Sequence, residues 1–244
     1  MQRGEVYIAE LNPVIGCEFG GQQLVVVVQN NYGNRQGFTF IVAPIDRRNK
    51  ARLPTHVEVE VMKKKVVVMA EQIRTISGAR FISFCGKLSD KDMTKVDQAL
   101  QISVGLAKYK RTKVLDEAPI QRGDIYYADL CYAFGSEQSG FRPVVVIQND
   151  YGNRYSPTTI IAPITTKKKG HMPTHVLHEY HGTTEVVLLE QVRAISCTRL
   201  VSRCGQMSKA DMSKIDEALK ISLGLAPLQR RTPLCNMNPP LIKG

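Results

Sequence analysis

The stretch VVVQNNYGNR at residues 26–35 recurs as VVIQNDYGNR at residues 145–154, a shift of 119 residues from position 26 to position 145. Four further pairs of segments show the same shift: QRGEVY (2–7) and QRGDIY (121–126), PTHV (54–57) and PTHV (173–176), EQIRTIS (71–77) and EQVRAIS (190–196), and DMTKVDQALQIS (92–103) and DMSKIDEALKIS (211–222). No gap is needed over the whole match, from residue 2 to residue 107. Each copy is therefore predicted to be a complete domain, because the units of stacked solenoids are only about 20–50 residues long.

The chain of 244 residues is expected to divide into four parts. Residues 1–110 and 122–228 form the two similar domains, residues 111–121 a linker, and residues 229–244 an extended or disordered tail. The linker is expected because this region is charged, contains Pro119 and has no sustained hydrophobic period. The tail is expected because it is rich in proline and has no amphipathic pattern.

Composition and charge restrict the class of protein. Apolar residues make up 43% and charged residues 23% of the chain, as in soluble globular proteins. No apolar run approaches the roughly 18–20 residues that span a bilayer, and the N-terminus lacks the apolar region of a signal peptide. We therefore expect a cytoplasmic protein that does not contact a membrane. The net charge of +11 is spread over both halves and favours an anionic partner, either a nucleic acid or an acidic protein segment.

No sequence feature predicts a metal or another cofactor. The six cysteines include no C-x-x-C pair, so they are expected to be reduced thiols rather than disulfides or zinc ligands. Four histidines lie between residues 171 and 181, but Pro173 breaks any helix there, and on a strand His178 would face away from the others. The first half keeps only His56 of this set. The chain also contains no P-loop, Rossmann fingerprint, nucleophile elbow or H-E-x-x-H motif.

The hydrophobic pattern of each half predicts several strands followed by one helix. Strands are expected at residues 4–11, 24–29, 40–44, 66–69 and 186–189. The NNYGNR and NDYGNR segments are expected to be turns between strands, because Asn and Gly favour turns. Ser89 with Asp92, and Ser208 with Asp211, predict capping boxes, each followed by apolar residues at helical spacing. Each half is thus expected to be an α+β, mainly β domain, in which a bent sheet with a barrel-like core carries one C-terminal helix.

The two halves differ where chemistry would occur. The second half places Arg142 before a strand and Thr165 at the end of the next one, whereas the first half has Gln23 and Asp46 at these positions. Cutting a phosphodiester without a metal requires a cation beside the developing phosphorane and proton transfer at two oxygens. Arginine suits this role because it is always charged and binds phosphate with a planar fork, while a carboxylate at Asp46 would repel phosphate. Alternatively, Arg142 is a surface residue before a strand and Thr165 a turn former.

A wider set of motifs resembles one family. GSEQSGFRPVVVIQNDYGNR, followed by APIT, PTHV and LLEQVRAIS, resembles the MazF/PemK family of toxin ribonucleases over residues 122–225, and residues 3–106 resemble it as continuously. The resemblance implies an SH3-like barrel of the MazF/PemK/CcdB type that works as a homodimer. It also implies metal-independent cleavage of single-stranded RNA at short motifs, which leaves 2′,3′-cyclic phosphate and 5′-hydroxyl ends. The implied partner is an antitoxin whose acidic, extended segment occupies the RNA groove.

The resemblance also implies roles for individual residues. Arg142 and Thr165 match the catalytic arginine and threonine, with Arg142 stabilising the phosphorane and donating to the leaving oxygen and Thr165 orienting a phosphate oxygen. Glu137 matches the acid of the GSEQ motif and is a candidate general base, because an arginine with a pKa above about 12 is a poor base. Five residues are expected to contact RNA: Ser136, Asn149, Gln191, Lys167 and Lys168. Two departures leave the conformation of the first loop open, because Ser139 replaces the usual glycine and Tyr132 stands where the family often has proline.

The implied reaction is attack of a ribose 2′-OH on its own 3′-phosphate, which restricts the substrate to RNA. Because the first half lacks the Arg/Thr pair, Gln23 and Asp46 predict an inactive counterpart. The leading hypothesis is a single chain whose halves pair as the family homodimer does, since a connection of about 14 residues could span on the order of 45 Å. One alternative is a non-catalytic RNA-binding or regulatory subunit. Another is a protein that poisons DNA gyrase by contact, as some relatives with this barrel do.

Overall fold

The structure is a computed structural model that describes residues 1–47, 53–108, 119–167, 170, 172–180 and 182–227. The first half is formed by β1 (Glu5–Glu10), β2 (Gln22–Val27), α1 (Asn31–Gln36), β3 (Thr39–Asp46), β4 (His56–Val61), β5 (Lys64–Met69), η1 (Ala70–Gln72), β6 (Arg74–Ser77), η2 (Gly78–Arg80), β7 (Phe81–Lys87) and α2 (Asp90–Ser103). The second half repeats this order with β8 (Asp124–Asp129), β9 (Phe141–Val146), α3 (Asp150–Tyr155), β10 (Thr158–Thr165), β11 (His175–Tyr180), β12 (Thr183–Leu188), η3 (Leu189–Gln191), β13 (Arg193–Ser196), η4 (Cys197–Arg199), β14 (Leu200–Gln206) and α4 (Lys209–Ser222). Most of the expected linker and all of the expected tail lie outside the described residues.

In each half one antiparallel sheet bends around an apolar core. The strand order in the first half is β7-β1-β2-β3, and β3 then pairs with β6 along its first residues and with β5 at its end. The second half has the order β14-β8-β9-β10, and β10 divides in the same way between β13 and β12. A strand that changes its partner in this way forms a corner that closes the sheet on itself. The predicted fold class is confirmed: two mainly β, SH3-like domains in tandem, each with a C-terminal helix.

The C-terminal helix of each half packs its apolar face on the sheet. In α2 the buried face carries Met93, Val96 and Leu100, as the spacing predicted. The helix starts at the predicted capping box, where the Ser89 hydroxyl accepts a hydrogen bond from the backbone N–H of Asp92 at 3.1 Å. The second half repeats the box in α4. No helix within the described ranges is long and apolar enough to span a membrane.

The segment after each Gln-Asn pair is a short helix and not the predicted turn. Asn30 caps α1 by accepting a hydrogen bond from the N–H of Gly33 at 2.7 Å, and Asn149 caps α3 through Gly152 at 2.7 Å. Asparagine favours both turns and helix N-caps, so the local pattern did not separate the two. The prediction of a turn was therefore wrong, although the chain does reverse direction at this place between two strands.

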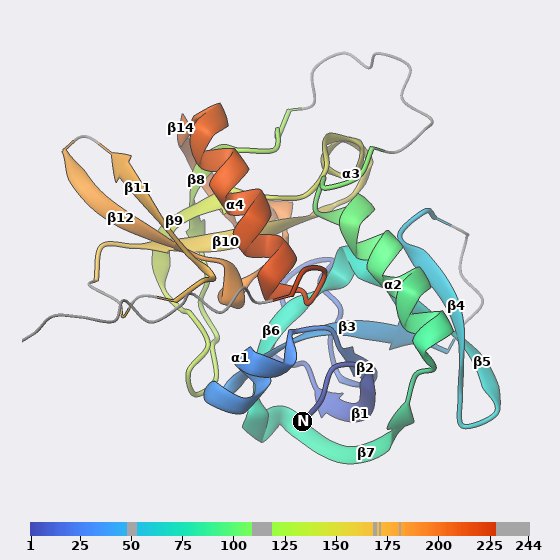
Figure 1. Cartoon of the computed structure of the whole chain (residues 1–244). Coiled ribbons are helices and arrows are strands. Elements are labelled where there is room, and N and C mark those ends of the chain that lie inside the picture. The colour runs from blue at the N-terminus through green and yellow to red at the C-terminus, as the bar shows by residue number, and fades with distance from the viewer. Residues whose placement is uncertain (48–52, 109–118, 168–169, 171, 181, 228–244) are drawn as a thin grey trace, which may run out of the picture.

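The two halves share one continuous sheet of 14 strands, because β6 of the first half pairs with β13 of the second. Arg74 lies opposite Arg193 in this pairing. Matching backbone hydrogen bonds flank the pair, from Thr75 N to Val192 O (2.9 Å) and from Ala194 N to Ile73 O (2.7 Å). Figure 1 shows β6 in the middle of the molecule, between the blue-to-green first half and the yellow-to-red second half. We call the region where β6 and β13 pair, together with the residues that bridge the halves around it, the joint. Its contacts are symmetric, because each half uses residues that are related by the shift of 119 residues.

Each half also binds the C-terminal end of the other half's helix. Four cross-contacts supply donors to the last carbonyls: Arg3 Nε to Leu223 O (3.2 Å), Arg122 Nε to Val104 O (3.0 Å), Asn30 Nδ2 to Ile221 O (2.9 Å) and Asn149 Nδ2 to Ile102 O (2.8 Å). The last carbonyls of a helix have no partner within the helix and carry partial negative charge. Donors from the opposite half therefore fix the ends of α2 and α4 where the two halves meet.

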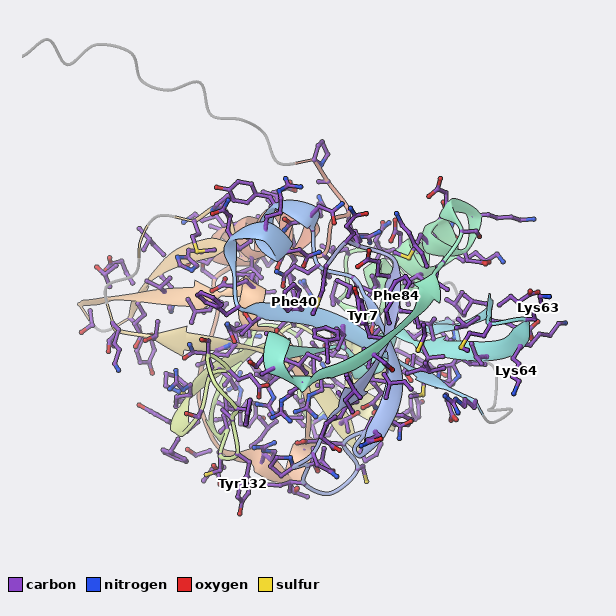
Figure 2. All side chains as sticks on the ribbon, turned by 90° about the horizontal axis from the view of Figure 1, so that it is seen from below. Tyr7, Phe40, Lys63, Lys64, Phe84 and Tyr132 are labelled. Atoms are coloured by element: carbon purple, nitrogen blue, oxygen red, sulfur yellow. The ribbon has the colours of Figure 1, made fainter. Side chains whose placement is uncertain are left out.

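The outer face of the first half carries an aromatic cluster. The ring of Tyr7 lies 5.0 Å from that of Phe81 and 5.4 Å from that of Phe84, and Phe40 lies 5.5 Å from Phe81. Figure 2 shows Tyr7, Phe40 and Phe84 close together on β1, β3 and β7. The matching positions of the second half hold Tyr126, Thr159, Leu200 and Arg203. The halves have therefore diverged in their outer packing as well as at the expected site.

Candidate active site

Arg142 and Thr165 lie at the ends of neighbouring strands, at one edge of the second half's sheet. Arg142 is the second residue of β9, and Thr165 is the last residue of β10. The strands pair up to Val144 and Pro163, so Arg142 and Thr165 each lie two residues beyond the last paired position, at the same end of the two strands. The fold thus places at one edge of the sheet two residues that belong to separate sequence motifs.

The guanidinium of Arg142 is held by the loop that precedes β9. Its Nε donates to the carbonyl of Ser139 at 2.7 Å, and its Nη1 donates to Oε1 of Gln138. Partial burial lowers the pKa of Arg142 from its ordinary value, but an arginine remains a cation at neutral pH. The arrangement therefore fixes one positive charge at the edge of the sheet.

Thr165 is largely buried, and its hydroxyl is at the end of β10. Its Oγ1 accepts a hydrogen bond from the backbone N–H of Lys167 at 3.2 Å, which leaves its O–H as a donor. Lys167 and Ser136 are exposed, as residues that contact RNA must be. Lys168 lies outside the described residues.

The first half keeps the loop and loses the charge. Gln23 Nε2 donates to the carbonyl of Gly20 at 2.9 Å, three residues before it, as Arg142 does to Ser139. The loop hydrogen bond is therefore preserved without a guanidinium. Asp46 takes the place of Thr165 at the end of β3 and is only 3% exposed.

Glu137 lies inside the joint between the halves. Its Oε1 accepts from Arg80 Nε at 2.5 Å and from the N–H of Ser77 at 2.8 Å, and its Oε2 accepts from Arg80 Nη2 at 3.1 Å and from the N–H of Phe134 at 3.2 Å. The Arg80 and Glu137 side chains are 4% and 2% exposed. Burial raises the pKa of Glu137, but hydrogen bonds from Arg80 and the backbone outweigh it and hold the pKa below its ordinary value. A buried carboxylate with occupied oxygens and a low pKa is a poor proton acceptor.

A matching ion pair joins Glu18 of the first half to Arg199 of the second, so acid and arginine have exchanged halves. Arg199 Nη1 lies 2.7 Å from Oε1 of Glu18, and these side chains are also nearly fully buried. Glu18 belongs to the half that lacks both Arg142 and Thr165. The ion pair therefore recurs where Arg142 and Thr165 have no counterpart, so it is a feature of the joint rather than of the candidate site.

Two other residues expected to contact RNA also join the halves. Gln191 is buried, and its Nε2 donates to Thr39 Oγ1 of the first half at 3.2 Å. Its counterpart Gln72 donates to Thr158 Oγ1 at 3.0 Å. Asn149 caps α3 and donates across the joint, as described above, although it also lines a pocket. The sequence predicted RNA contacts for Gln191 and Asn149 but not their hydrogen bonds across the joint, and the RNA contacts stay predictions.

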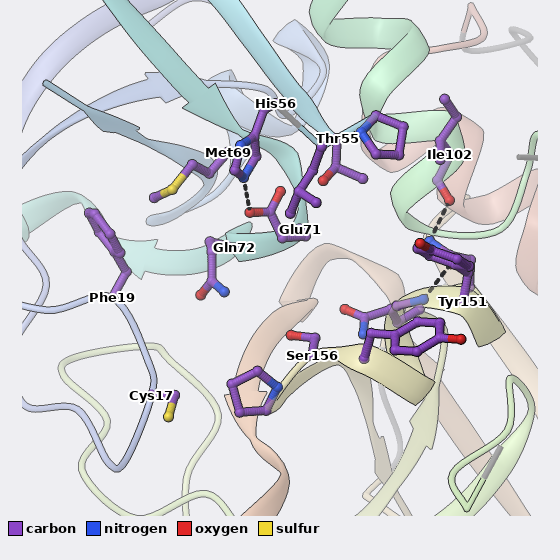
Figure 3. Close-up of a pocket in the computed structure, with 17 residues that line it drawn as sticks. Cys17, Phe19, Thr55, His56, Met69, Glu71, Gln72, Ile102, Tyr151 and Ser156 are labelled. Carbon is purple, nitrogen blue, oxygen red and sulfur yellow. Dashed lines mark hydrogen bonds and ion pairs between the residues drawn. The ribbon is translucent and has the colours of Figure 1, made fainter. Parts of the chain in front are cut away.

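A pocket of about 420 Å³ is lined by residues of both halves. Figure 3 shows Glu71 and Gln72 of η1 facing Tyr151 of α3 and Ser156, the residue that follows this helix. Three aromatic side chains supply flat apolar surface: Phe19, Tyr151 and Tyr155. Polar groups at the same pocket include Gln72, Ser156 and the His56–Glu71 pair, whose Nε2 and Oε1 atoms are 2.8 Å apart.

Sequence reasoning missed this pocket because its two walls come from different halves. The pocket could have been indicated by positions at which the two halves carry different residues. Phe19 matches Gln138, and Tyr155 matches Gln36. Two of the three aromatic rings at this pocket are therefore replaced by glutamine at the matching positions of the other half.

The two histidines of the second half that the structure describes, His175 and His178, do not converge on one point, and His171 and His181 lie outside the described residues. His175 Nε2 lies 3.1 Å from Glu190 Oε1, and His178 Nδ1 lies 3.1 Å from Asp211 Oδ2. Three residues apart on β11, they face opposite sides of the strand. Across the described part of the chain, no three His, Cys, Asp or Glu side chains are grouped to hold a metal ion, and the five cysteines there are free thiols.

Comparisons with known proteins agree on one family. The family model described as "PemK-like, MazF-like toxin of type II toxin-antitoxin system" matches twice, at residues 2–104 and 121–223. Endoribonuclease EndoA of Bacillus subtilis (strain 168) is 50% identical over 111 residues, which cover 43% of this chain and 96% of that protein. MazF from Deinococcus radiodurans has a solved structure that is 23% identical, with a TM-score of 0.39, over 43% of this chain and 96% of that one. An endoribonuclease from a mycobacterial species, solved with its cognate antitoxin, is 23% identical, with a TM-score of 0.39, over 45% of this chain and 99% of that one.

Proposed function

The chain belongs to the family of PemK-like, MazF-like toxins of type II toxin–antitoxin systems, and we propose that it is an endoribonuclease whose second half alone cuts RNA. The proposal rests on a difference between the two halves at the corresponding edge of their sheets. The second half has Arg142 and Thr165 at the ends of β9 and β10, and the first half has Gln23 and Asp46 at the same places. The relative EndoA, at 50% identity, is itself named an endoribonuclease.

The proposed reaction uses the RNA's own ribose as the nucleophile and needs no metal. The 2′-hydroxyl loses its proton to solvent water as its oxygen attacks the adjacent phosphorus, and the bond from phosphorus to the 5′-oxygen breaks. The products are a 2′,3′-cyclic phosphate and a 5′-hydroxyl, and the proton released to water balances the one that the leaving oxygen receives. Arg142 stabilises the negative charge that develops on the phosphorane and delivers a proton to the leaving oxygen. Its pKa, lowered by burial, makes that delivery easier than for an exposed arginine. The hydroxyl of Thr165 donates to a non-bridging phosphate oxygen.

Glu137 has a different role in this proposal from the one that its motif implied. It does not remove the proton of the 2′-hydroxyl, because its oxygens are engaged by Arg80 and two backbone N–H groups and its pKa is low. It anchors the loop that carries Gln138 and Ser139 to the first half, and these two residues hold Arg142. The acid thus supports the arginine through the fold and not through proton transfer.

The first half acts as a partner and as an RNA-binding surface. We infer that the two halves pair within the chain as a pseudo-dimer, because hydrogen bonds from Gln72 and Asn30 across the joint are matched by hydrogen bonds from Gln191 and Asn149 in the opposite direction. The pocket lined by Phe19, Tyr151 and Tyr155 suits an unstacked base of a single strand, since bases stack on aromatic rings with little regard to sequence. The net charge of +11 supports binding of the RNA backbone.

An antitoxin with an acidic, extended segment is the protein partner that we propose. The family is defined by toxin–antitoxin pairs, and a solved relative was obtained with its cognate antitoxin. A segment of this kind would compete with RNA for the same basic surface. We place the reaction in the cytoplasm, where both RNA and antitoxin are made.

The test uses purified full-length protein and end-labelled single-stranded RNA in EDTA. The proposal expects cut fragments with 2′,3′-cyclic phosphate and 5′-hydroxyl ends, and it expects a 2′-deoxynucleotide at the cut position to block cleavage. Binding without any cut product would favour the alternative of a non-catalytic RNA-binding subunit. Cleavage of the 2′-deoxy substrate at the same bond would overturn the mechanism.

A further inference from the structure

Two arginines are buried side by side at the centre of the joint between the halves. Arg74 of β6 and Arg193 of β13 are direct partners in the antiparallel pairing, so their side chains leave the same face of the sheet. They are 3% and 2% exposed. Two like charges are therefore held close together and away from water.

Neither guanidinium has enough acceptors. Arg74 Nη1 donates to the carbonyl of Leu11 at 2.9 Å. The Nε and Nη2 atoms of both Arg74 and Arg193, however, are buried with no acceptor among the residues that the structure describes. Four buried nitrogen atoms that carry N–H groups therefore lie without acceptors where β6 pairs with β13. Buried polar groups in native proteins nearly always have a partner, so these donors indicate an acceptor that the described residues do not supply.

The nearby acids are already in use. Glu18 and Glu137 act on both buried arginines electrostatically, but their oxygens are bound by Arg199 and Arg80 respectively. The cluster therefore contains four arginines and two glutamates, an excess of two positive charges. Burial, and then repulsion by Arg193, lower the pKa of Arg74 to about 9, which still leaves it protonated at neutral pH. The excess charge persists at neutral pH.

We propose that a small inorganic anion such as chloride binds between Arg74 and Arg193. A chloride ion accepts several hydrogen bonds at once and carries the charge that the cluster lacks. Water would accept only some of these bonds and would leave the repulsion between the two guanidinium groups in place. We propose a monatomic ion because both arginines are nearly fully buried, and a close-packed interior disfavours a larger oxyanion.

Such an anion would act as a structural bridge between the halves. It would link β6 to β13 and lie beside the Arg80–Glu137 and Arg199–Glu18 pairs. Its binding belongs to the folded, paired chain alone, because the site does not exist until Arg74 meets Arg193. The inference does not depend on RNA cleavage.

Crystals of the full-length protein grown with bromide in place of chloride give the direct test. Bromide scatters anomalously, so the proposal expects one strong anomalous peak within hydrogen-bond distance of Nε or Nη2 of both Arg74 and Arg193. Ordinary water density at this place, with no anomalous signal, would overturn it. This measurement uses the unaltered protein and does not depend on whether any variant folds.

Thermal unfolding in solution gives the second test. At constant ionic strength, replacing gluconate by chloride should raise the Tm by a few degrees for each tenfold increase in chloride above its Kd. Bromide should replace chloride, and phosphate should not. Arg193→Met should abolish the dependence, whereas Arg3→Met, which removes an arginine that already has an acidic partner in Asp97, should retain it. A Tm that is the same in chloride, phosphate and gluconate would contradict the proposal.

Discussion

Arg80 of the first half and Glu137 of the second form a buried ion pair, with Arg80 Nε 2.5 Å from Glu137 Oε1. Glu137 belongs to the same loop as Gln138 and Ser139, the two residues that bind the guanidinium of Arg142. The loop beside the candidate active site is therefore anchored on the other half of the chain. The half that lacks Arg142 and Thr165 thus contributes to the order of the half that has them.

Glu137→Gln is expected to destabilise the protein by about 3–5 kcal/mol, because Arg80 would remain buried without a counter-charge. Glu18→Gln is the matched control, since the Glu18–Arg199 pair is equally buried, and a similar loss is expected. Urea unfolding measures both. At a temperature where both variants are folded, each should still cut RNA. A Glu137→Gln protein that is as stable as the wild type but inactive would instead identify Glu137 as the general base.

Stability should fall in acid as Glu137 takes up a proton. Its folded pKa is lower than the ordinary value of 4.5, so its contribution is complete above that value and is lost as the pH falls through the folded pKa. Urea unfolding from about pH 7 down to about pH 3 should show a steeper loss for wild type than for Glu137→Gln, which has no carboxylate to titrate there. Equal slopes for the two proteins would argue against the ion pair.

Gln138→Phe should slow cleavage without unfolding the protein. The change removes the amide that accepts from Arg142 Nη1 and introduces the residue that the first half has at this place, Phe19. Loss of one positioning hydrogen bond is worth about 1.4 kcal/mol, or roughly tenfold in kcat. The reverse change in the first half, Phe19→Gln, should leave kcat unaltered. Equal losses of kcat in both variants would show that position 138 has no special relationship to Arg142.

Tyr155→Ala should weaken RNA binding while leaving the maximal rate unchanged. Stacking of a base on an aromatic ring is worth about 1–3 kcal/mol, so the Kd for a non-cleavable 2′-deoxy-substituted strand should rise by roughly 5-fold to 150-fold. Phe84→Ala is a suitable control, because Phe84 is 59% exposed on the outer face and does not line the pocket. If both variants bind RNA as wild type does, the pocket takes no base.

Local patterns predicted a large part of this fold. The repeat defined the two halves, and Ser89 and Ser208 marked the starts of their helices because a cap depends on residues only three positions away. The alternating HVEVEV of β4 is a strand signal that the prediction left out. The short helix after Asn30 was missed because asparagine is common both in turns and at helix N-caps.

The roles of Glu137, Asn149 and Gln191 could not be read from their own segments. Each is a polar residue in a motif that suggests a site, but each finds its partner in the other half, at Arg80, Ile102 and Thr39. Burial and pairing across the joint decide their chemistry, and neither is encoded in local spacing. Arg142 and Thr165, by contrast, could be singled out by comparing the two halves, because at these positions the halves differ in charge.

Initial rates of RNA cleavage in EDTA by wild type, Arg142→Gln and Gln23→Ala test the central claim most directly. Arg142→Gln gives the second half the residue of the first, and its rate should fall by about 100-fold to 1000-fold, as expected when a group that stabilises the transition-state charge is lost. Gln23→Ala should stay within about twofold of wild type, because no charge is removed. Full activity in Arg142→Gln, or loss of activity in a folded Gln23→Ala, would contradict a single cutting site in the second half.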